Sequence, residues 1–238
     1  MTSALSSSDH PVSPDGPRRP RLLVFDVNET LSDMSPMSAR FADVGAPEHL
    51  ASLWFAELLR DGFALTAAGG IESFATLGAE ALRVRLAGQP IDGPLEEAVE
   101  HVMQGFSELH VHSDVVDGVH ALADLGIRLV TLSNGSAGVA ETLLQRAGVR
   151  DRFERLLTVE DAGAWKPALP AYRYALEECG VEPMDAMLVA VHPWDIHGAR
   201  RAGLATAWID RTSSRYPSYF TAPDVEAVSL VALADALK

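Results

Sequence analysis

Residues 21 to 27 read RLLVFDV, a short apolar run that ends close to an acid. A continuous apolar run of this length, flanked by polar residues, is typical of a strand buried on both faces of a parallel sheet. The run therefore predicts the first strand of an α/β fold. Its carboxyl end carries Asp26.

The pattern changes to helical between residues 36 and 110. PEHLASLWFAELLRDGFAL and GPLEEAVEHVMQGFSEL place apolar residues three and four apart, which is the spacing of an amphipathic helix. No strand pattern separates them, so this segment is predicted to be a helical insertion. Within it, the small residues of ALTAAGG at 64–70 predict a loop, which either shapes the roof of a pocket or forms a simple interhelical turn.

After the insertion, strand and helix patterns alternate up to LATAWIDR, which we interpret as the last strand. This alternation predicts an α/β fold, a doubly wound parallel sheet with helices on both faces and an inserted helical cap. We assign residues 21–35 and 111–238 to the α/β core and 36–110 to the cap. Residues 1–20 are rich in Ser, Pro and Gly and are predicted to form a disordered tail.

Composition excludes several classes of function. The formal net charge of -14 argues against nucleic acid and anionic membrane surfaces as partners, because a phosphate backbone requires a basic stripe. No apolar run approaches the length of a membrane helix, and the start of the chain lacks the apolar core of a secretion signal. We therefore expect a soluble, cytoplasmic protein. The one cysteine, Cys179, is expected to be a small buried apolar group.

Polar side chains follow four separate apolar runs. These segments are FDVNETLSD at 25–33, TLSNGS at 131–136, WKP at 165–167 and HPWD at 192–195. In a parallel sheet the carboxyl ends of the strands meet at one edge, where ligands bind. The sequence therefore predicts one site built from all four segments.

This constellation resembles the haloacid dehalogenase superfamily, with its Rossmann-like core, from Arg21 onward. Within it, SNG, the KP pair followed by Tyr172, the WD of the fourth motif and WIDR are similar to the L-2-haloacid dehalogenases. The resemblance implies that Asp26 is a nucleophile that forms a covalent ester, as carboxylates can. It implies that Lys166 keeps this carboxylate ionised and that Asp195 positions Lys166 and the water that hydrolyses the ester.

The remaining site residues follow from the same motifs. The hydroxyls of Thr30 and Ser133 and the amide of Asn134 can orient carboxylates without adding charge, although these residue types also serve in turns and helix caps. Residues expected to contact the substrate, a small anionic molecule, are Val27, Asn28, Trp54, Phe55, Tyr172 and His192. The imidazole of His192 could share the activation of water or simply pack structurally before Pro193.

Asn28 bears on the reaction type. Phosphatases of the superfamily carry a second Asp at this position, because an alkoxide leaving group needs a proton from a general acid. Asn28 cannot supply one, whereas a halide leaves without a proton. The fourth motif has one acid, Asp195, where metal-dependent relatives present two or more, so we expect no required metal and no cofactor.

Three departures from the dehalogenases concern substrate recognition. Phe55 follows the cap Trp54 where those enzymes have an Arg that receives the halide, and Asn28 and Ala190 stand where they tend to have Tyr and Ser. Of the adjacent aromatic pair, one is expected to belong to the cap core, since neighbouring helical residues point about 100° apart.

The leading hypothesis is hydrolytic removal of halide from a short 2-haloalkanoate. A second keeps the ester intermediate but opens a strained ring, as in azetidine-carboxylate hydrolases, and phosphatase activity ranks below both. A binding module with vestigial chemistry is the alternative from another class, and a homodimer formed through the cap helices is a further expectation from the resemblance.

Overall fold

The computed structural model describes residues 19–238, and the predicted tail lies outside them except for Arg19 and Pro20, of which Pro20 is buried. Six strands form one sheet in the order β3-β2-β1-β4-β5-β6, and every neighbouring pair is parallel. The strands are β1 (Leu22–Phe25), β2 (Arg128–Ser133), β3 (Arg155–Thr158), β4 (Ala186–Ala190), β5 (Ala205–Ile209) and β6 (Val225–Ala227). The predicted α/β parallel sheet is confirmed.

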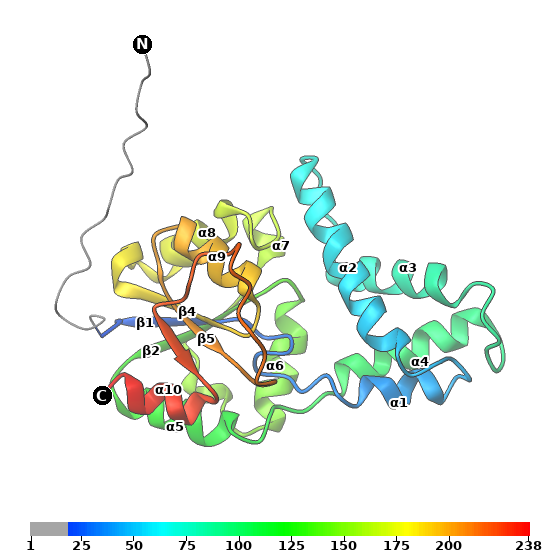
Figure 1. Cartoon of the computed structure of the whole chain (residues 1–238), viewed down its shortest axis with the longest axis horizontal. Helices are drawn as coiled ribbons and strands as arrows, with labels where there is room; N and C mark the ends of the chain where they lie inside the picture. Colours follow the sequence, from blue (N-terminus) through cyan, green and yellow to red (C-terminus); the bar gives the residue numbers. More distant parts are fainter. Residues whose placement is uncertain (1–18) are drawn as a thin grey trace, which may run out of the picture.

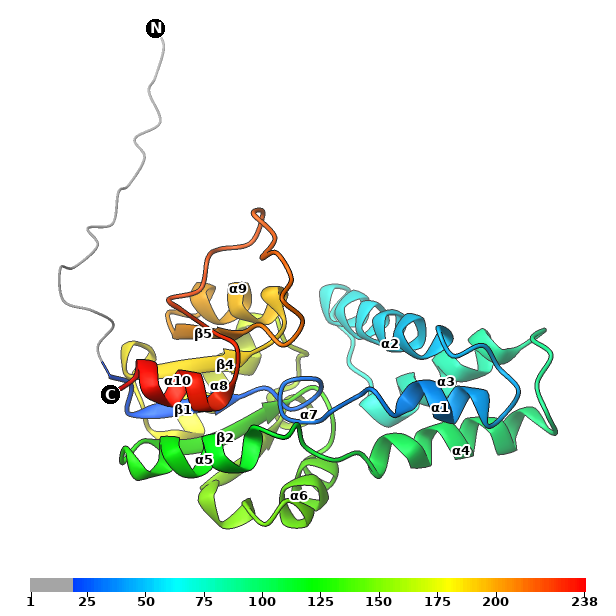
Figure 2. The ribbon, with the colours of Figure 1, turned by 60° about the horizontal axis from the view of Figure 1, so that its bottom comes forward.

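Helices cover both faces of the sheet (Figures 1 and 2). One face packs against α5 (Val115–Asp124), α6 (Ala137–Arg146) and α10 (Leu230–Ala236), and the other against α8 (Leu169–Cys179) and α9 (Pro193–Arg201). The short α7 (Val159–Ala162) follows β3. Side chains of β1 alternate between the two cores because successive strand residues point to opposite faces. Cys179 is buried, as expected.

Four helices lie between β1 and α5 in the chain and form a layer beside the sheet, which we call the cap (Figure 1). They are α1 (Met37–Ala42), α2 (Leu50–Ala67), α3 (Phe74–Leu86) and α4 (Leu95–Ser107). Their placement agrees with a helical insertion. The division of the chain into separate domains near residues 36 and 110 stays a prediction.

Two local predictions were wrong. LATAWIDR is not the last strand, because β6 and α10 follow it, and the three-residue VEA strand is too short to leave an apolar pattern. ALTAAGG is a loop only in its second half, because α2 continues through Ala67. Alanine favours the helix, and the chain leaves it where Gly69 adopts a φ of 81°.

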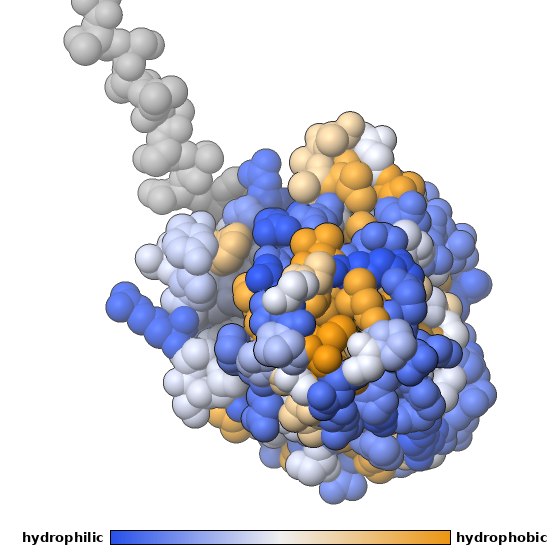
Figure 3. Space-filling view, turned by 90° about the vertical axis from the view of Figure 1, so that its right-hand side faces the viewer, coloured by the Kyte–Doolittle hydropathy of each residue, from blue (hydrophilic) through white to orange (hydrophobic). Residues whose placement is uncertain are grey.

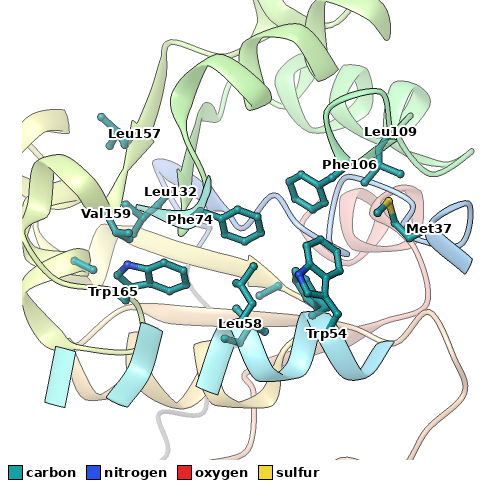
Figure 4. Close-up of a cluster of buried hydrophobic side chains, with 14 of the residues drawn as sticks. Met37, Trp54, Leu58, Phe74, Phe106, Leu109, Leu132, Leu157, Val159 and Trp165 are labelled. Atoms are coloured by element: carbon teal, nitrogen blue, oxygen red, sulfur yellow. The ribbon is translucent and has the colours of Figure 1, made fainter. Parts of the chain in front are cut away.

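The cap packs against the core through Trp165 (Figure 4). The Trp165 ring stacks on Phe74 of α3 with 6.1 Å between ring centroids, and its indole N–H donates to the carbonyl of Glu72 at 3.0 Å. Its backbone N–H donates to Thr66 Oγ1 at 3.1 Å. Because Trp165 directly precedes Lys166, the cap contacts the loop that carries the predicted catalytic lysine.

The outer side of the cap exposes apolar side chains, and Figure 3 shows apolar surface gathered on this end of the molecule. The exposed ones on the cap helices and their connecting turn are Leu53, Leu65, Ile71 and Val84. None of the helices within residues 19–238 combines the length and the apolar character that crossing a bilayer requires.

Candidate active site

A buried lysine joins two carboxylates at the carboxyl edge of the sheet. Lys166 Nζ lies 2.9 Å from Asp26 Oδ1 and 2.6 Å from Asp195 Oδ2. The Lys166 and Asp195 side chains are fully buried, and that of Asp26 nearly so. Asp26 follows β1, Asp195 lies in the first turn of α9 after β4, and Lys166 reaches in from the loop before α8. Three segments that are distant in the sequence therefore form one charge cluster.

The environment separates the two carboxylates electrostatically. Burial raises the pKa of Asp26, but Lys166, His192 and the Thr30 hydrogen bond outweigh it, so the net pKa is lowered. Burial also raises the pKa of Asp195, and here the nearby Asp26 adds to the increase, so the net pKa is raised despite Lys166. The pKa of Lys166 is raised because both carboxylates outweigh its burial. An ionised carboxylate beside a more basic one is an arrangement that suits a two-step displacement.

Thr30 fixes the orientation of Asp26. Its hydroxyl donates to Asp26 Oδ2 at 2.6 Å and accepts from the backbone N–H of Val191 at 3.1 Å. The Thr30 carbonyl in turn accepts two hydrogen bonds from the Arg211 guanidinium, at 3.1 and 2.8 Å, and Arg211 also pairs with Asp114 at 2.7 Å. Both oxygens of the Asp26 carboxylate are therefore held, Oδ1 by the lysine and Oδ2 by the threonine.

Asn134 and Ser133 act on the backbone around the site. Asn134 Oδ1 accepts from the Lys166 N–H at 3.0 Å, and its Nδ2 donates to the Lys166 carbonyl at 3.4 Å. Ser133 Oγ accepts from the Gly135 N–H at 2.9 Å, which is a turn contact. Asn134 thus holds the lysine loop, while Ser133 shows the turn role that its residue type commonly has.

Tyr172 lies on the far side of Asp195 from the lysine. Its hydroxyl donates to Asp195 Oδ1 at 2.5 Å, and the side chain is fully buried. Burial and the Asp195 charge raise the pKa of Tyr172 well above its ordinary value, so the phenol stays a donor. A Cβ at Gly198 would lie 2.4 Å from this hydroxyl, which explains the glycine. In this arrangement Tyr172 positions Asp195, whereas the sequence suggested a substrate contact.

The two aromatic residues of α2 have different surroundings. Trp54 is fully buried in the cap core, where its indole N–H donates to the Gly78 carbonyl at 2.9 Å and its ring packs near Phe106 (Figure 4). Phe55 is also buried in this core, where its ring packs near Phe74, and in addition it lines a cavity of about 220 Å³. The expectation that one of the pair belongs to the cap core was too narrow, because both do. A substrate contact by Trp54 is disfavoured because its side chain is fully buried and its indole N–H is already bonded to Gly78.

Val27 and Asn28 directly follow Asp26 in the chain. The Val27 side chain packs into the core between the sheet and α5, which leaves its backbone as the part that can face a ligand. Asn28 is buried, and its amide nitrogen would lie 3.6 Å from a Cβ built at Gly135. Both residues lie at the wall of a small crevice of about 10 Å³ that also touches Phe106 and Leu109 of the cap side.

His192 lies beside Asp26, and its Nε2 is 3.7 Å from Asp26 Oδ2. The same nitrogen is 3.3 Å from the Asn28 carbonyl and 3.5 Å from Glu29 Oε2. Glu29 and Arg211 were not predicted as site residues. The WIDR motif was the sequence signal that could have indicated Arg211. For Glu29 the available signal was its position three residues after Asp26.

Two cavities adjoin this part of the site. The larger, about 280 Å³, is lined by both His192 and Glu29, and the other is the one that Phe55 lines. Glu29, Met34 and Ser35 line both. Among the described residues 19–238, no cluster of three or more His, Cys, Asp or Glu side chains is arranged to hold a metal ion, and the Lys166 ammonium lies between the two buried carboxylates.

Comparison with known proteins identifies the family. Residues 20–203 match the model of the haloacid dehalogenase-like hydrolases. The chain belongs to this family of hydrolases. The hydrolase is 28% identical over 217 residues to the (S)-2-haloacid dehalogenase of Pseudomonas sp. strain YL, covering 90% of this chain and 92% of that one.

Two further relatives agree with this. The hydrolase is 30% identical over 129 residues to a haloacetate dehalogenase of Moraxella sp. strain B, covering 54% of this chain and 58% of that one. A crystal structure of an L-2-haloacid dehalogenase matches with a TM-score of 0.86 at 26% identity, covering 92% of this chain and 99% of that one. The resemblance inferred from the four motifs is confirmed.

Proposed function

We propose that this hydrolase removes halide from a short 2-haloalkanoate and yields the 2-hydroxy acid. The observation that carries the proposal is the buried Lys166 ammonium, which is within hydrogen-bond distance of both Asp26 and Asp195. This geometry supplies an ionised carboxylate nucleophile and a second carboxylate for the following hydrolysis. Named relatives that act on 2-haloacids and haloacetate support this substrate class.

In the first step, Asp26 attacks the carbon that carries the halogen from the side opposite the leaving group. A carbon–oxygen bond forms, the carbon–halogen bond breaks, and the configuration of that carbon inverts. Lys166 and Thr30 hold the carboxylate for this attack, so little reorientation is required during the reaction. Asn28 supplies no acid, and a chloride or bromide ion leaves without a proton.

In the second step, water attacks the acyl carbon of the Asp26 ester. We propose that Asp195, whose pKa is raised by burial, accepts the proton from this water and that Lys166 stabilises the negative charge that develops. Tyr172 fixes the orientation of Asp195. The reaction uses side chains that the chain itself provides, so we propose that it requires no metal.

A second candidate reaction is ring opening of a strained, azetidine-carboxylate-like substrate through the same ester. The cavity that Phe55 lines favours it, because none of that cavity's lining residues is cationic and could receive a halide. Arg211 lines the neighbouring cavity, but its guanidinium is bonded to Asp114 and Thr30. Phosphate-ester hydrolysis ranks lower because of Asn28, and a binding module lower still, because the charge cluster is complete.

The decisive experiment measures halide release from chloroacetate, bromoacetate and L-2-chloropropionate with EDTA present. We expect release together with a mass adduct on Asp26 and, in ¹⁸O water under single turnover, one ¹⁸O atom in that carboxylate before any appears in product. Asp26→Asn should abolish turnover, by about 10⁴-fold or more, with an unchanged circular dichroism spectrum. Normal activity in that variant, or ¹⁸O only in the product, would contradict the ester mechanism.

Two further properties are proposed with the function. The exposed apolar side chains of the cap support a homodimer, which light scattering of the purified protein tests. A cytoplasmic location stays a prediction that fractionation of cells tests.

A further inference from the structure

Glu29 adopts a backbone conformation that its residue type rarely takes. Its φ is 62°, in the left-handed region that favours glycine. The loop that holds it follows the nucleophile directly, and the Glu29 carbonyl is bonded by His112 at 2.9 Å. Strained conformations of this kind gather at functional sites, where the surrounding structure enforces them. The contacts around Glu29 therefore hold its side chain in a defined position.

The Glu29 carboxylate faces the imidazole of His192, which in turn faces the nucleophile. His192 Nε2 lies 3.5 Å from Glu29 Oε2 and 3.7 Å from Asp26 Oδ2. It is also 3.3 Å from the Asn28 carbonyl, which can only accept a hydrogen bond, so Nε2 carries a hydrogen. A hydrogen-bond donor is therefore held beside the Asp26 carboxylate, on the opposite oxygen from the one that Lys166 binds, and when Nδ1 is protonated as well the imidazolium can give up the Nε2 proton.

Aromatic packing that begins in α9 and extends to the cap holds the imidazole in this orientation. Its ring stacks on Trp194 with 4.8 Å between centroids and an interplanar angle of 17°. Trp194 packs against Phe63 of α2 with 4.9 Å between centroids. The His192 side chain is 12% exposed, so it reaches the cavity while most of its surface is covered.

The charged and titratable groups around His192 come from several elements. Asp26 and Glu29 face its Nε2 directly, and Lys166 lies beyond Asp26. Other such groups that line the same cavity are Asp33, His112, Asp210 and Arg211. Burial raises the pKa of Glu29, and Asp26 raises it further, against the opposing effect of His192.

We propose that His192, positioned by Glu29, gives a proton to the leaving group and recovers one from the hydrolytic water. This inference rests on the proposed function and names the leaving groups that the site accepts. Bromide and chloride leave readily as anions, but fluoride, being more basic, leaves better with a proton. The hydrolase then accepts carbon–fluorine substrates. For these substrates His192 supplies the general acid that Asn28 cannot provide.

As Asp26 forms its bond to the substrate carbon and the carbon–fluorine bond breaks, fluoride takes the Nε2 proton from the imidazolium form of His192 and leaves as hydrogen fluoride, and the ring becomes neutral imidazole. Water then adds to the acyl carbon of the ester. One of its protons returns to His192 in this cycle, through Asp195 or directly, and the other ends on the hydroxyl of the product when the ester bond breaks. Asp26 is regenerated with one oxygen from water.

The test compares fluoroacetate with bromoacetate in one metal-free assay. Wild type is expected to release both halides. In Glu29→Gln and His192→Asn, fluoride release should fall by about 100-fold more than bromide release, because the contribution of a general acid depends on the leaving group. Ser35→Ala, which changes the wall of the same cavity, should leave the ratio of the two rates at its wild-type value.

Bromide release also reports whether each variant is folded. Glu29→Gly is a second variant, since glycine suits the φ of 62° and removes the carboxylate without adding strain. A fluoride-to-bromide ratio unchanged within about threefold in all three variants would overturn the role of the pair. Bromide release without fluoride release by wild type would overturn it as well. Release of neither halide by wild type would instead contradict the proposed function, and the inference with it.

Discussion

The core side of the site and the cap side are built on different physical principles. On the core side, the two carboxylates and the lysine between them are buried, and each of them forms specific side-chain hydrogen bonds. On the cap side, contact with the core includes aromatic packing at Trp165 and at Trp194 and two hydrogen bonds of Trp165. The charge cluster of the core side determines the reaction, and the packing of the cap determines which molecule reaches the charge cluster.

The largest effect is expected from breaking the core arrangement at Lys166. Lys166→Met leaves two buried carboxylates without their counter-charge and should destabilise the fold by about 3 to 5 kcal/mol near neutral pH. The cost arises from unpaired charge, so the loss should be smaller in an Asp195→Asn background. Urea unfolding of the single and double variants measures both. An equal loss in the two backgrounds would show that packing and not charge sets the cost.

An intermediate effect is expected where α2 of the cap meets Trp165. A Cβ at Gly62 would lie 2.5 Å from the indole ring, so Gly62→Ala must move the helix or the ring. We expect a loss of about 1 to 3 kcal/mol from overpacking, and a KM that rises more than kcat falls. Gly69→Ala offers a contrast. Its Cβ would meet nothing within 4 Å, so a loss of stability in that variant would come from the backbone φ of 81° and not from crowding. A kcat loss in Gly62→Ala with KM unchanged would mean that the contact serves the chemistry.

The smallest effect concerns the ion pair behind the nucleophile loop. Asp114 is partly buried, which raises its pKa, but Arg211 and the Leu230 N–H outweigh burial and hold it below 3.8. A carboxylate whose pKa is lower in the folded than in the unfolded protein stabilises the fold at pH values above its unfolded-state pKa. This stabilisation is lost as the pH falls through the folded-state pKa. Asp114→Asn should therefore cost no more than about 1 kcal/mol at pH 7 and less as the pH approaches 3. Urea midpoints between pH 3 and 7 measure this, and a constant difference would exclude the charge as its origin.

The same contrast explains what could be predicted from the sequence. Asp26, Lys166 and Asp195 each follow an apolar run, and the rule that parallel strands end at one edge was enough to bring them together. The roles of Tyr172 and Trp54 required the structure, because the sequence does not say whether a buried hydroxyl contacts substrate or another side chain. Glu29 was missed because its left-handed backbone and its orientation toward His192 depend on contacts with distant residues.

The position of β1 in the middle of the sheet has a consequence for how the molecule is made. β1 is the first strand in the chain, yet it pairs with β2 on one side and with β4 on the other. Asp26 and Lys166 are separated by 140 positions, so the site closes only after most of the polypeptide has left the ribosome. Contacts of such long range slow folding, because a large loop must close before they are gained. During that interval the first strand, whose side chains are buried on both faces in the folded protein, has a partner at neither edge.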